Sequence, residues 1–143
     1  KVKAIRHAGI VVKDLAGALH FYRDILGLKL KKRMKESGRY IDTISGMKNI
    51  EVTTIKLATK DGNLIELLYY NSHPRAAVRK YRICRTGISH VAFTVEDIDS
   101  EYKRLRRAGI SFNSAPQISP DRYAKVAFCR DFEENLVELV EVL

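Results

Sequence analysis

The order of apolar and polar positions occurs twice along the chain. Each copy opens with a short apolar segment rich in β-branched residues, at 3–12 and again at 88–95, which is typical of strands. An aspartate follows, and apolar residues then recur every three or four positions up to a glycine, which is the pattern of an amphipathic helix. The two predicted helices lie between Asp14 and Gly27 and between Asp97 and Gly109. Aspartate suits the first turn of a helix and glycine suits its end, so both boundaries agree with the pattern.

Three further strand-like segments complete each copy. They are 28–35, 52–58 and 64–70 in the first copy and 110–113, 124–129 and 136–142 in the second. The pattern predicts an α+β fold of two tandem βαβββ modules, at 1–70 and 87–143, joined by a linker at 71–86. The first copy is about eleven residues longer, and we expect the excess in a loop between Glu36 and Glu51.

Four residues do not suit the apolar strands that contain them. His7 and His90 lie in the first strand of each copy, and Glu66 and Glu138 lie in the last. Those last strands are apolar on both faces, and a carboxylate in such a place is costly unless it is paired, protonated or bound to a metal. A single residue of this kind is usually a hydrogen-bonded core or surface group, but here four fall at equivalent positions of a repeat.

The four residues are candidate metal ligands. A pseudo-twofold arrangement of the modules could bring two imidazoles and two carboxylates to one cavity. That mixed nitrogen and oxygen set suits Zn, Ni, Co, Mn or Fe and is too rich in nitrogen for a typical Ca or Mg site. The absence of thiolate ligands favours a catalytic metal over a structural one.

The net charge of the chain is compatible with several kinds of binding partner. Its 143 residues carry 26 Lys+Arg and 17 Asp+Glu, a formal net charge of +9. The basic residues are spread out and show no nucleic-acid-binding motif, so we expect no nucleic acid and favour a small, possibly anionic substrate. No apolar run has the length of a membrane helix, and the two cysteines form no disulfide framework, so we expect a cytoplasmic protein with no membrane partner.

The motifs of the two copies resemble those of a known superfamily. They are His7-Ala-Gly-Ile-Val-Val-Lys-Asp-Leu with His20-Phe-Tyr-Arg-Asp-Ile-Leu-Gly-Leu, His90-Val-Ala-Phe-Thr-Val-Glu-Asp, and the two glutamate strands. Over nearly the whole chain they are similar to the vicinal oxygen chelate superfamily, which includes glyoxalase I, extradiol dioxygenases, methylmalonyl-CoA epimerase and the bleomycin and fosfomycin resistance proteins.

This resemblance implies paired βαβββ modules that curl around a divalent metal ion. The ligands would be His7, Glu66, His90 and Glu138, an order similar to that of bacterial glyoxalase I. The implied activity is that of a lyase or isomerase in which a carboxylate at the metal moves a proton of a metal-chelated substrate. By position, Glu138 would be the catalytic base and Glu66 its pseudo-symmetric partner, and the implied assembly is a homodimer.

Three other functions stay open at this stage. An Fe(II) extradiol-type dioxygenase would use His7, His90 and Glu138 and would leave Glu66 without a role. An epimerase of coenzyme A esters would suit the basic surface, but Thr54 stands where its glutamate is expected and Glu51 is displaced. A binding or resistance protein would hold a small molecule without chemistry.

Overall fold

The computed structural model describes residues 1–73 and 80–143, which form two compact units, Lys1–Ala77 and Val78–Leu143. Each unit is described by itself. The predicted linker at 71–86 lies partly outside the described residues. No helix among the described residues has the length and apolar character to cross a membrane.

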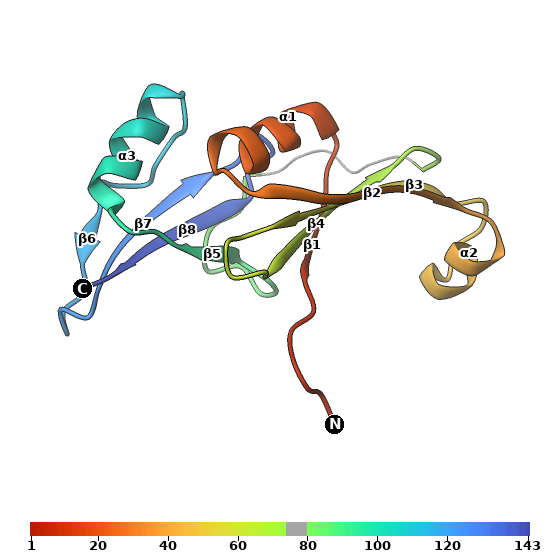
Figure 1. Ribbon diagram of the computed structural model, residues 1–143, viewed down its shortest axis with the longest axis horizontal. Helices are drawn as coiled ribbons and strands as arrows, with labels where there is room; N and C mark the ends of the chain where they lie inside the picture. Colours follow the sequence, from red (N-terminus) through yellow and green to blue (C-terminus); the bar gives the residue numbers. More distant parts are fainter. Residues whose placement is uncertain (74–79) are drawn as a thin grey trace. The chain divides into compact units, whose positions relative to one another are not determined.

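The first unit contains one four-stranded mixed sheet (Figure 1). The sheet has the order β1-β4-β3-β2, with β1 parallel to β4 and the other neighbours antiparallel. Its elements are β1 (Ala8–Val11), α1 (Leu15–Leu19), the π-helix η1 (His20–Ile25), β2 (Lys29–Ser37), α2 (Arg39–Ser45), β3 (Glu51–Ala58) and β4 (Leu64–Tyr70). The first and last strands of the module are therefore neighbours.

The second unit has the same topology. Its elements are β5 (His90–Thr94), α3 (Ile98–Arg107), β6 (Gln117–Ile118), β7 (Ala124–Arg130) and β8 (Leu136–Val142). The sheet order is β5-β8-β7-β6, and β5 is parallel to β8. The α+β class and the tandem βαβββ modules predicted from the sequence are confirmed.

Each sheet has one face that packs into a core. In β8, Val137 and Leu139 are fully buried and alternate with Glu138, so the core lies on the face opposite this glutamate. The carboxylate of Glu141, on the core side of β8, accepts a hydrogen bond of 2.8 Å from the backbone N–H of Ile98 and so holds the start of α3 against that face. In the first unit, Leu67 has the position of Leu139 and is equally buried. The glutamates are left on the other face of each sheet.

The repeat extends to the tight turn before each last strand. In the first unit the carboxylate of Asp61 accepts hydrogen bonds from the backbone and side chain of Asn63, and Asp131 does the same for Asn135 in the second. The residue before each asparagine has a left-handed backbone, with φ 88° at Gly62 and 67° at Glu134. Glycine adopts that conformation freely, whereas Glu134 is strained there.

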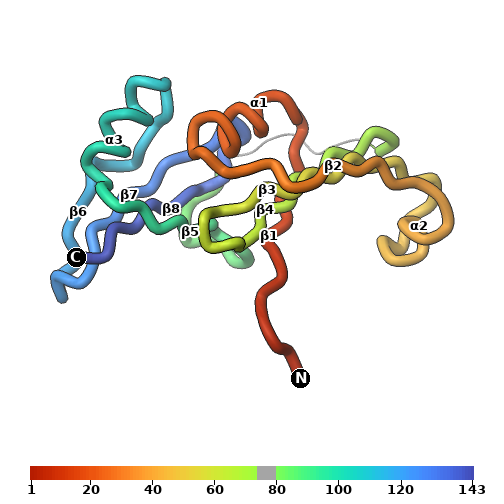
Figure 2. Tube along the Cα trace, in the orientation of Figure 1, coloured from red at the N-terminus to blue at the C-terminus, as the bar shows by residue number. Residues whose placement is uncertain are grey.

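Three local predictions differ from the structure. The predicted strand at 3–12 begins only at Ala8, and the preceding residues form an extended segment (Figure 2). The predicted strand at 110–113 is wrong, because the structure has only an isolated bridge between Phe112 and Cys129 there, and the short strand β6 follows later. The polar segment Asn113-Ser-Ala-Pro interrupts the pairing, since proline cannot donate to a sheet.

The insertion in the first copy was predicted as a loop and contains the helix α2. Tyr40, Ile41 and Ile44 recur at helical spacing, but none of the residues of α2 is buried, so the helix covers no core. Its ends are set by Gly38 and Gly46, which have positive φ angles. The carboxylate of Asp42 accepts hydrogen bonds from the backbone N–H groups of Asn49 and Ile50 and thereby ties the helix to the segment that leads into β3.

The equivalence of the two cores makes a stability prediction. Replacing Leu67 or Leu139 with alanine should each lower the free energy of unfolding by about 2–5 kcal/mol, because each substitution leaves a cavity in a closed core. The control Leu30→Ala, at a position that is 49% exposed, should change it by about 0.5 kcal/mol or less. Urea denaturation measures all three variants, and a small effect of either core substitution would contradict the equivalence.

Candidate metal centre

The first unit pairs His7 with Glu66. His7 immediately precedes β1, and the parallel register places Gly9 opposite Glu66 in β4. Since residues two apart in a strand share a face, His7 and Glu66 project from the same side of the sheet. The His7 Nε2 atom lies 2.8 Å from the Glu66 Oε2 atom, and the glutamate side chain is only 13% exposed.

The second unit repeats this geometry with His90 and Glu138. His90 is opposite Leu136 in the register of β5 with β8, and Ala92 is opposite Glu138. The His90 Nε2 atom lies 3.0 Å from the Glu138 Oε2 atom, and the glutamate side chain is 20% exposed. In both pairs the same imidazole nitrogen faces the carboxylate.

The surroundings of the two pairs differ. Lys56 is directly opposite Glu66 in the register of β3 with β4, whereas Phe128 is opposite Glu138 in β7 with β8. The Phe128 ring meets the His90 ring edge to face, with centroids 5.2 Å apart. The first pair therefore has a cationic neighbour and the second has an apolar one.

Ser89 fixes the orientation of His90. Its hydroxyl lies 2.6 Å from the His90 Nδ1 atom. A hydrogen bond donated by Nδ1 to this hydroxyl leaves the Nε2 lone pair available to a metal ion, which is a common second contact of metal-binding histidines. Arg6 stands at the equivalent position before His7, so this contact belongs to the second unit alone.

The geometry of each pair fits adjacent ligands of one divalent cation. The observed separations of 2.8 and 3.0 Å are those of an imidazole N–H that donates to a carboxylate oxygen. A divalent ion would take the place of that proton between the same two atoms. The structure brings the four predicted ligands together as two pairs, and among the described residues of either unit no third His, Cys, Asp or Glu joins its pair.

Other polar residues singled out by their type have structural partners. His20 and Arg23 both contact Asp24 on the exposed surface of η1, and the hydrogen bonds from Arg23 and then His20 lower the pKa of Asp24 to about 2. Lys125 forms an ion pair with Asp99. These contacts stabilise the surface of each unit and include none of the four candidate ligands.

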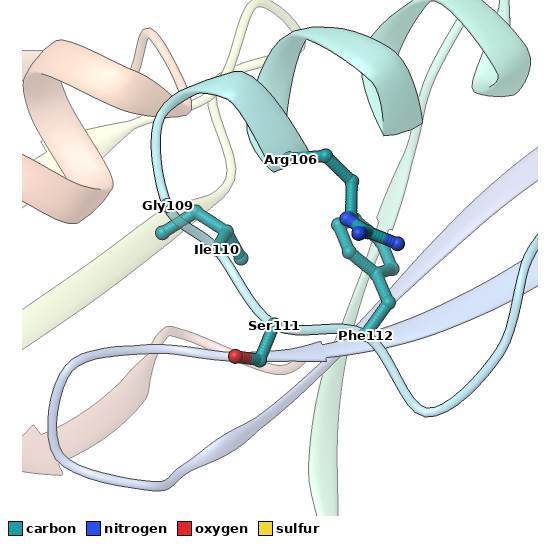
Figure 3. Close-up of a pocket in the computed structure, with 5 residues that line it drawn as sticks. All are labelled: Arg106, Gly109, Ile110, Ser111 and Phe112. Atoms are coloured by element: carbon teal, nitrogen blue, oxygen red, sulfur yellow. The ribbon is translucent and has the colours of Figure 1, made fainter.

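A large open cavity in the second unit does not include the histidine and glutamate pair. It has a volume of about 390 Å³ and lies where α3 ends and the chain turns back beneath it. Figure 3 shows Arg106 extending from the helix over Phe112, with the segment from Gly109 to Ser111 forming the other side. The guanidinium of Arg106 donates a hydrogen bond of 3.0 Å to the Tyr102 hydroxyl.

A smaller cavity, of about 60 Å³, lies beside His90. Ser89 and Leu136 are among its lining residues, together with Arg82, Arg85 and Arg130. The sequence did not predict that these arginines lie together, because Arg130 is 45 or more positions from the other two. The basic character of the segment before His90 was the only available signal.

Comparisons with known proteins agree with the fold and its repeat. A family model described as the Glyoxalase/Bleomycin resistance protein/Dioxygenase superfamily matches residues 4–139. The crystal structure of a glyoxalase family protein from Bacillus cereus matches with a TM-score of 0.89 and 28% identity, and the match covers 100% of this chain and 96% of that one.

Two sequence relatives extend the comparison. The uncharacterized protein YurT of Bacillus subtilis is 30% identical over 132 residues, which cover 92% of this chain and 94% of YurT. Lactoylglutathione lyase of Schizosaccharomyces pombe is 28% identical over 146 residues, which cover 95% of this chain and 46% of that enzyme. The chain thus has the length of one copy of the fold and about half the length of the lyase.

The two cysteines should differ in reactivity. Cys84 is exposed, whereas Cys129 is buried, and the loss of hydration raises the pKa of the Cys129 thiol to about 12. Since the thiolate is the reactive form, the native protein should react with one equivalent of a thiol reagent at pH 8 and the unfolded protein with two. Absorbance of the released product measures both, and Cys84→Ser should leave no rapidly reacting thiol. Two rapidly reacting thiols in the native protein would contradict the placement of Cys129.

Proposed function

Because this chain belongs to the glyoxalase, bleomycin resistance protein and dioxygenase superfamily, we propose that it is a metal-dependent lyase or isomerase of the glyoxalase I type. The observation that carries the proposal is the pair of equivalent contacts, His7 to Glu66 and His90 to Glu138. One histidine and one glutamate from each module make a set of four ligands. In the proposal these four hold one divalent ion, which is Zn, Ni, Co, Mn or Fe.

The repeat supports four ligands over three. A dioxygenase site needs two histidines and one carboxylate, which would leave Glu66 without a role. Glu66 has the same histidine contact, the same strand position and a similar low exposure as Glu138. A dioxygenase site does not require Glu66 to repeat the histidine contact of Glu138. Two equivalent histidine and glutamate pairs therefore favour the glyoxalase type.

The epimerase alternative lacks its carboxylate. Thr54 lies on the same face of β3 as Lys56 and is 6% exposed, and it is opposite Leu68 in the register with β4. Glu51 alternates with these residues and therefore lies on the other face of the strand. Neither residue places a second acid beside Glu66.

The proposed reaction moves one proton between two neighbouring carbons. In a hemithioacetal of a 2-oxoaldehyde, the proton leaves the carbon that carries the hydroxyl and the sulfur, and it is added to the adjacent carbonyl carbon. The hydroxyl proton of the first carbon passes to the carbonyl oxygen of the second. The first carbon thereby becomes the thioester carbonyl and the second becomes an alcohol carbon, so the isomerisation needs no external oxidant or reductant. A divalent ion at the four ligands would stabilise the negative charge that develops on the two substrate oxygens.

The protein itself contributes a base and a means of orienting it. Glu138 takes the proton and returns it, and Glu66 serves as its pseudo-symmetric partner among the ligands. Ser89 holds the His90 ring through its Nδ1 atom, so the Nε2 atom remains directed toward Glu138. The Phe128 ring meets the His90 ring edge to face and so gives the imidazole a second contact besides Ser89.

The assembly proposed for the active protein is a homodimer with modules at 1–70 and 87–143. Two modules must supply ligands to one ion, and they can belong to one chain or to two. Either arrangement gives the same number of sites per chain. The cytoplasm is the proposed location, and a small and possibly anionic molecule is the proposed substrate.

The proposal predicts distinct effects of removing carboxylate groups. Glu138→Gln keeps an oxygen ligand but cannot accept a proton, so kcat for the methylglyoxal–thiol hemithioacetal with Ni(II), Co(II) or Zn(II) should fall by about 10²–10⁴-fold. The control Glu51→Gln lies on the other face of its sheet and should retain the wild-type kcat. Thioester formation followed by ultraviolet absorbance measures the rates.

Two results would contradict this proposal. One is a Glu138→Gln variant that keeps its full kcat while it still binds the metal ion. The other is a wild-type protein that binds metal but consumes oxygen with Fe(II) and a catechol and forms no thioester.

A further inference from the structure

The small cavity beside His90 is lined, within the described part of the chain, by residues of the second unit. It has a volume of about 60 Å³. Its walls are the segment that leads into β5 and the turn between β7 and β8. The lining residues that matter below are Arg82, Arg85, Ser89, Arg130, Glu134 and Asn135.

The cavity has a positive balance of charge. Arg82, Arg85 and Arg130 contribute three positive charges and Glu134 one negative charge, which leaves a formal +2. Arg85 and Arg82 are exposed, and the guanidinium carbon of Arg85 lies 4.0 Å from the centre of the Tyr81 ring. Arginine is suited to hold an oxyanion because its planar group can donate two parallel hydrogen bonds.

Arg130 is the buried cation of this cavity. Its side chain is only 12% exposed, and it donates hydrogen bonds to the backbone oxygens of Glu134, at 2.8 Å, and Tyr81, at 3.1 Å. Its Nε atom is buried and has no hydrogen-bond partner among the described residues. A buried and unpaired donor is costly, and an acceptor in the cavity would satisfy it.

Glu134 forms an ion pair with that donor that is too long for a hydrogen bond. Its Oε2 atom is 3.6 Å from the Arg130 Nε atom and, like it, is buried without a hydrogen-bond partner in the described part of the chain. The residue also has a strained, left-handed backbone at the place where the first module has Gly62. The carboxylate is therefore a weakly held negative group next to the cation that an incoming anion would contact.

The cavity is close to the candidate metal ligands. His90 and Arg130 lie on either side of Leu136 in the register of the sheet and project from the same face. Two strand spacings separate their Cα atoms, a distance of about 10 Å. Ser89 contacts the His90 ring and also lines the cavity.

We propose that this cavity binds one oxyanion group, a carboxylate, phosphate or phosphonate, at the far end of the small molecule that reaches the His90 and Glu138 pair. The volume accommodates a group of a few atoms and excludes a whole substrate, so the cavity is a subsite. Only its link to the substrate rests on the proposed function. The binding of the oxyanion is a property of the second unit itself.

The test uses metal-free protein and two probes, inorganic phosphate and acetate. Calorimetry measures affinity, and the amide signals of Ser89 and Asn135 in a nitrogen-15 correlation spectrum report where the anion binds. The double variant Arg82→Gln/Arg85→Gln should weaken binding by at least tenfold, whereas the charge-matched control Arg106→Gln/Arg107→Gln should change it less than twofold. Equal losses in both double variants, or no shift at Ser89 and Asn135, would overturn the proposal. Phosphate that binds more tightly than acetate assigns a phosphate or phosphonate, and the reverse assigns a carboxylate.

The variant Glu134→Gly is a second test, in which anion binding should become tighter. The substitution restores the residue of the first module at a left-handed position and removes the one carboxylate from the cavity. Affinity for the preferred anion should rise at least threefold, and an unchanged or weaker affinity would contradict the role given to Glu134. This variant leaves the hydrogen bonds of Arg130 to backbone oxygens in place.

The subsite and the proposed activity fail in different ways. A protein that binds the oxyanion through Arg82 and Arg85 but turns over no hemithioacetal would refute the activity and retain the subsite. If the hemithioacetal of an anionic thiol is a substrate, the Arg82→Gln/Arg85→Gln variant should raise its KM at least tenfold with little change in kcat. The same variant should leave the KM for an uncharged thiol nearly unchanged, and equal effects on the two substrates would refute the link to the subsite.

Discussion

A single carboxylate in the last strand of each module determines how the rest of this structure must be organised. Glu66 and Glu138 lie among apolar neighbours in strands whose opposite face forms the core. A carboxylate there needs a partner, and the parallel pairing of the first strand with the last supplies a histidine at 2.8 or 3.0 Å. The parallel register therefore places one imidazole nitrogen and one carboxylate oxygen on the same face of each sheet. The same solution is present in both units.

The sequence predicted the residues of this arrangement but not their pairing within each module. The repeat placed a histidine in the first strand and a glutamate in the last strand of each copy, whereas the parallel register that puts the two on one face is seen only in the structure. The order of elements followed from apolar periodicity, which is strong where an element covers a core, as Ile98 and Leu105 do in α3. The helix α2 was predicted as a loop, because the helical spacing of Tyr40, Ile41 and Ile44 was not recognised in a segment of seven residues that covers no core. The bridge at Phe112 shows the reverse error, since an apolar segment before a proline was predicted as a strand.

The cavity beside His90 could not be predicted from the sequence, for a different reason. Arg130 and Arg82 are far apart in the chain, and only the folded turn between β7 and β8 brings them to one space. Single arginines show no periodicity along the sequence, and a glutamate such as Glu134 is not expected to have a left-handed backbone. The two modules have the same histidine and glutamate pair but differ around it, with Phe128 in place of Lys56, Ser89 in place of Arg6 and Glu134 in place of Gly62. The environment of the second pair is therefore specific to the second module.

The stoichiometry of metal binding tests most directly the claim that the two pairs act as one site. Equilibrium dialysis against Ni(II) or Zn(II), followed by elemental analysis, should give one ion per chain for the wild-type protein. His7→Ala and His90→Ala should each lower the affinity at least a hundredfold, because each removes one of four ligands, and His20→Ala, which changes an exposed histidine of η1, should bind as the wild type does. Unchanged binding by either His7→Ala or His90→Ala, or two independent ions per chain, would contradict a shared site.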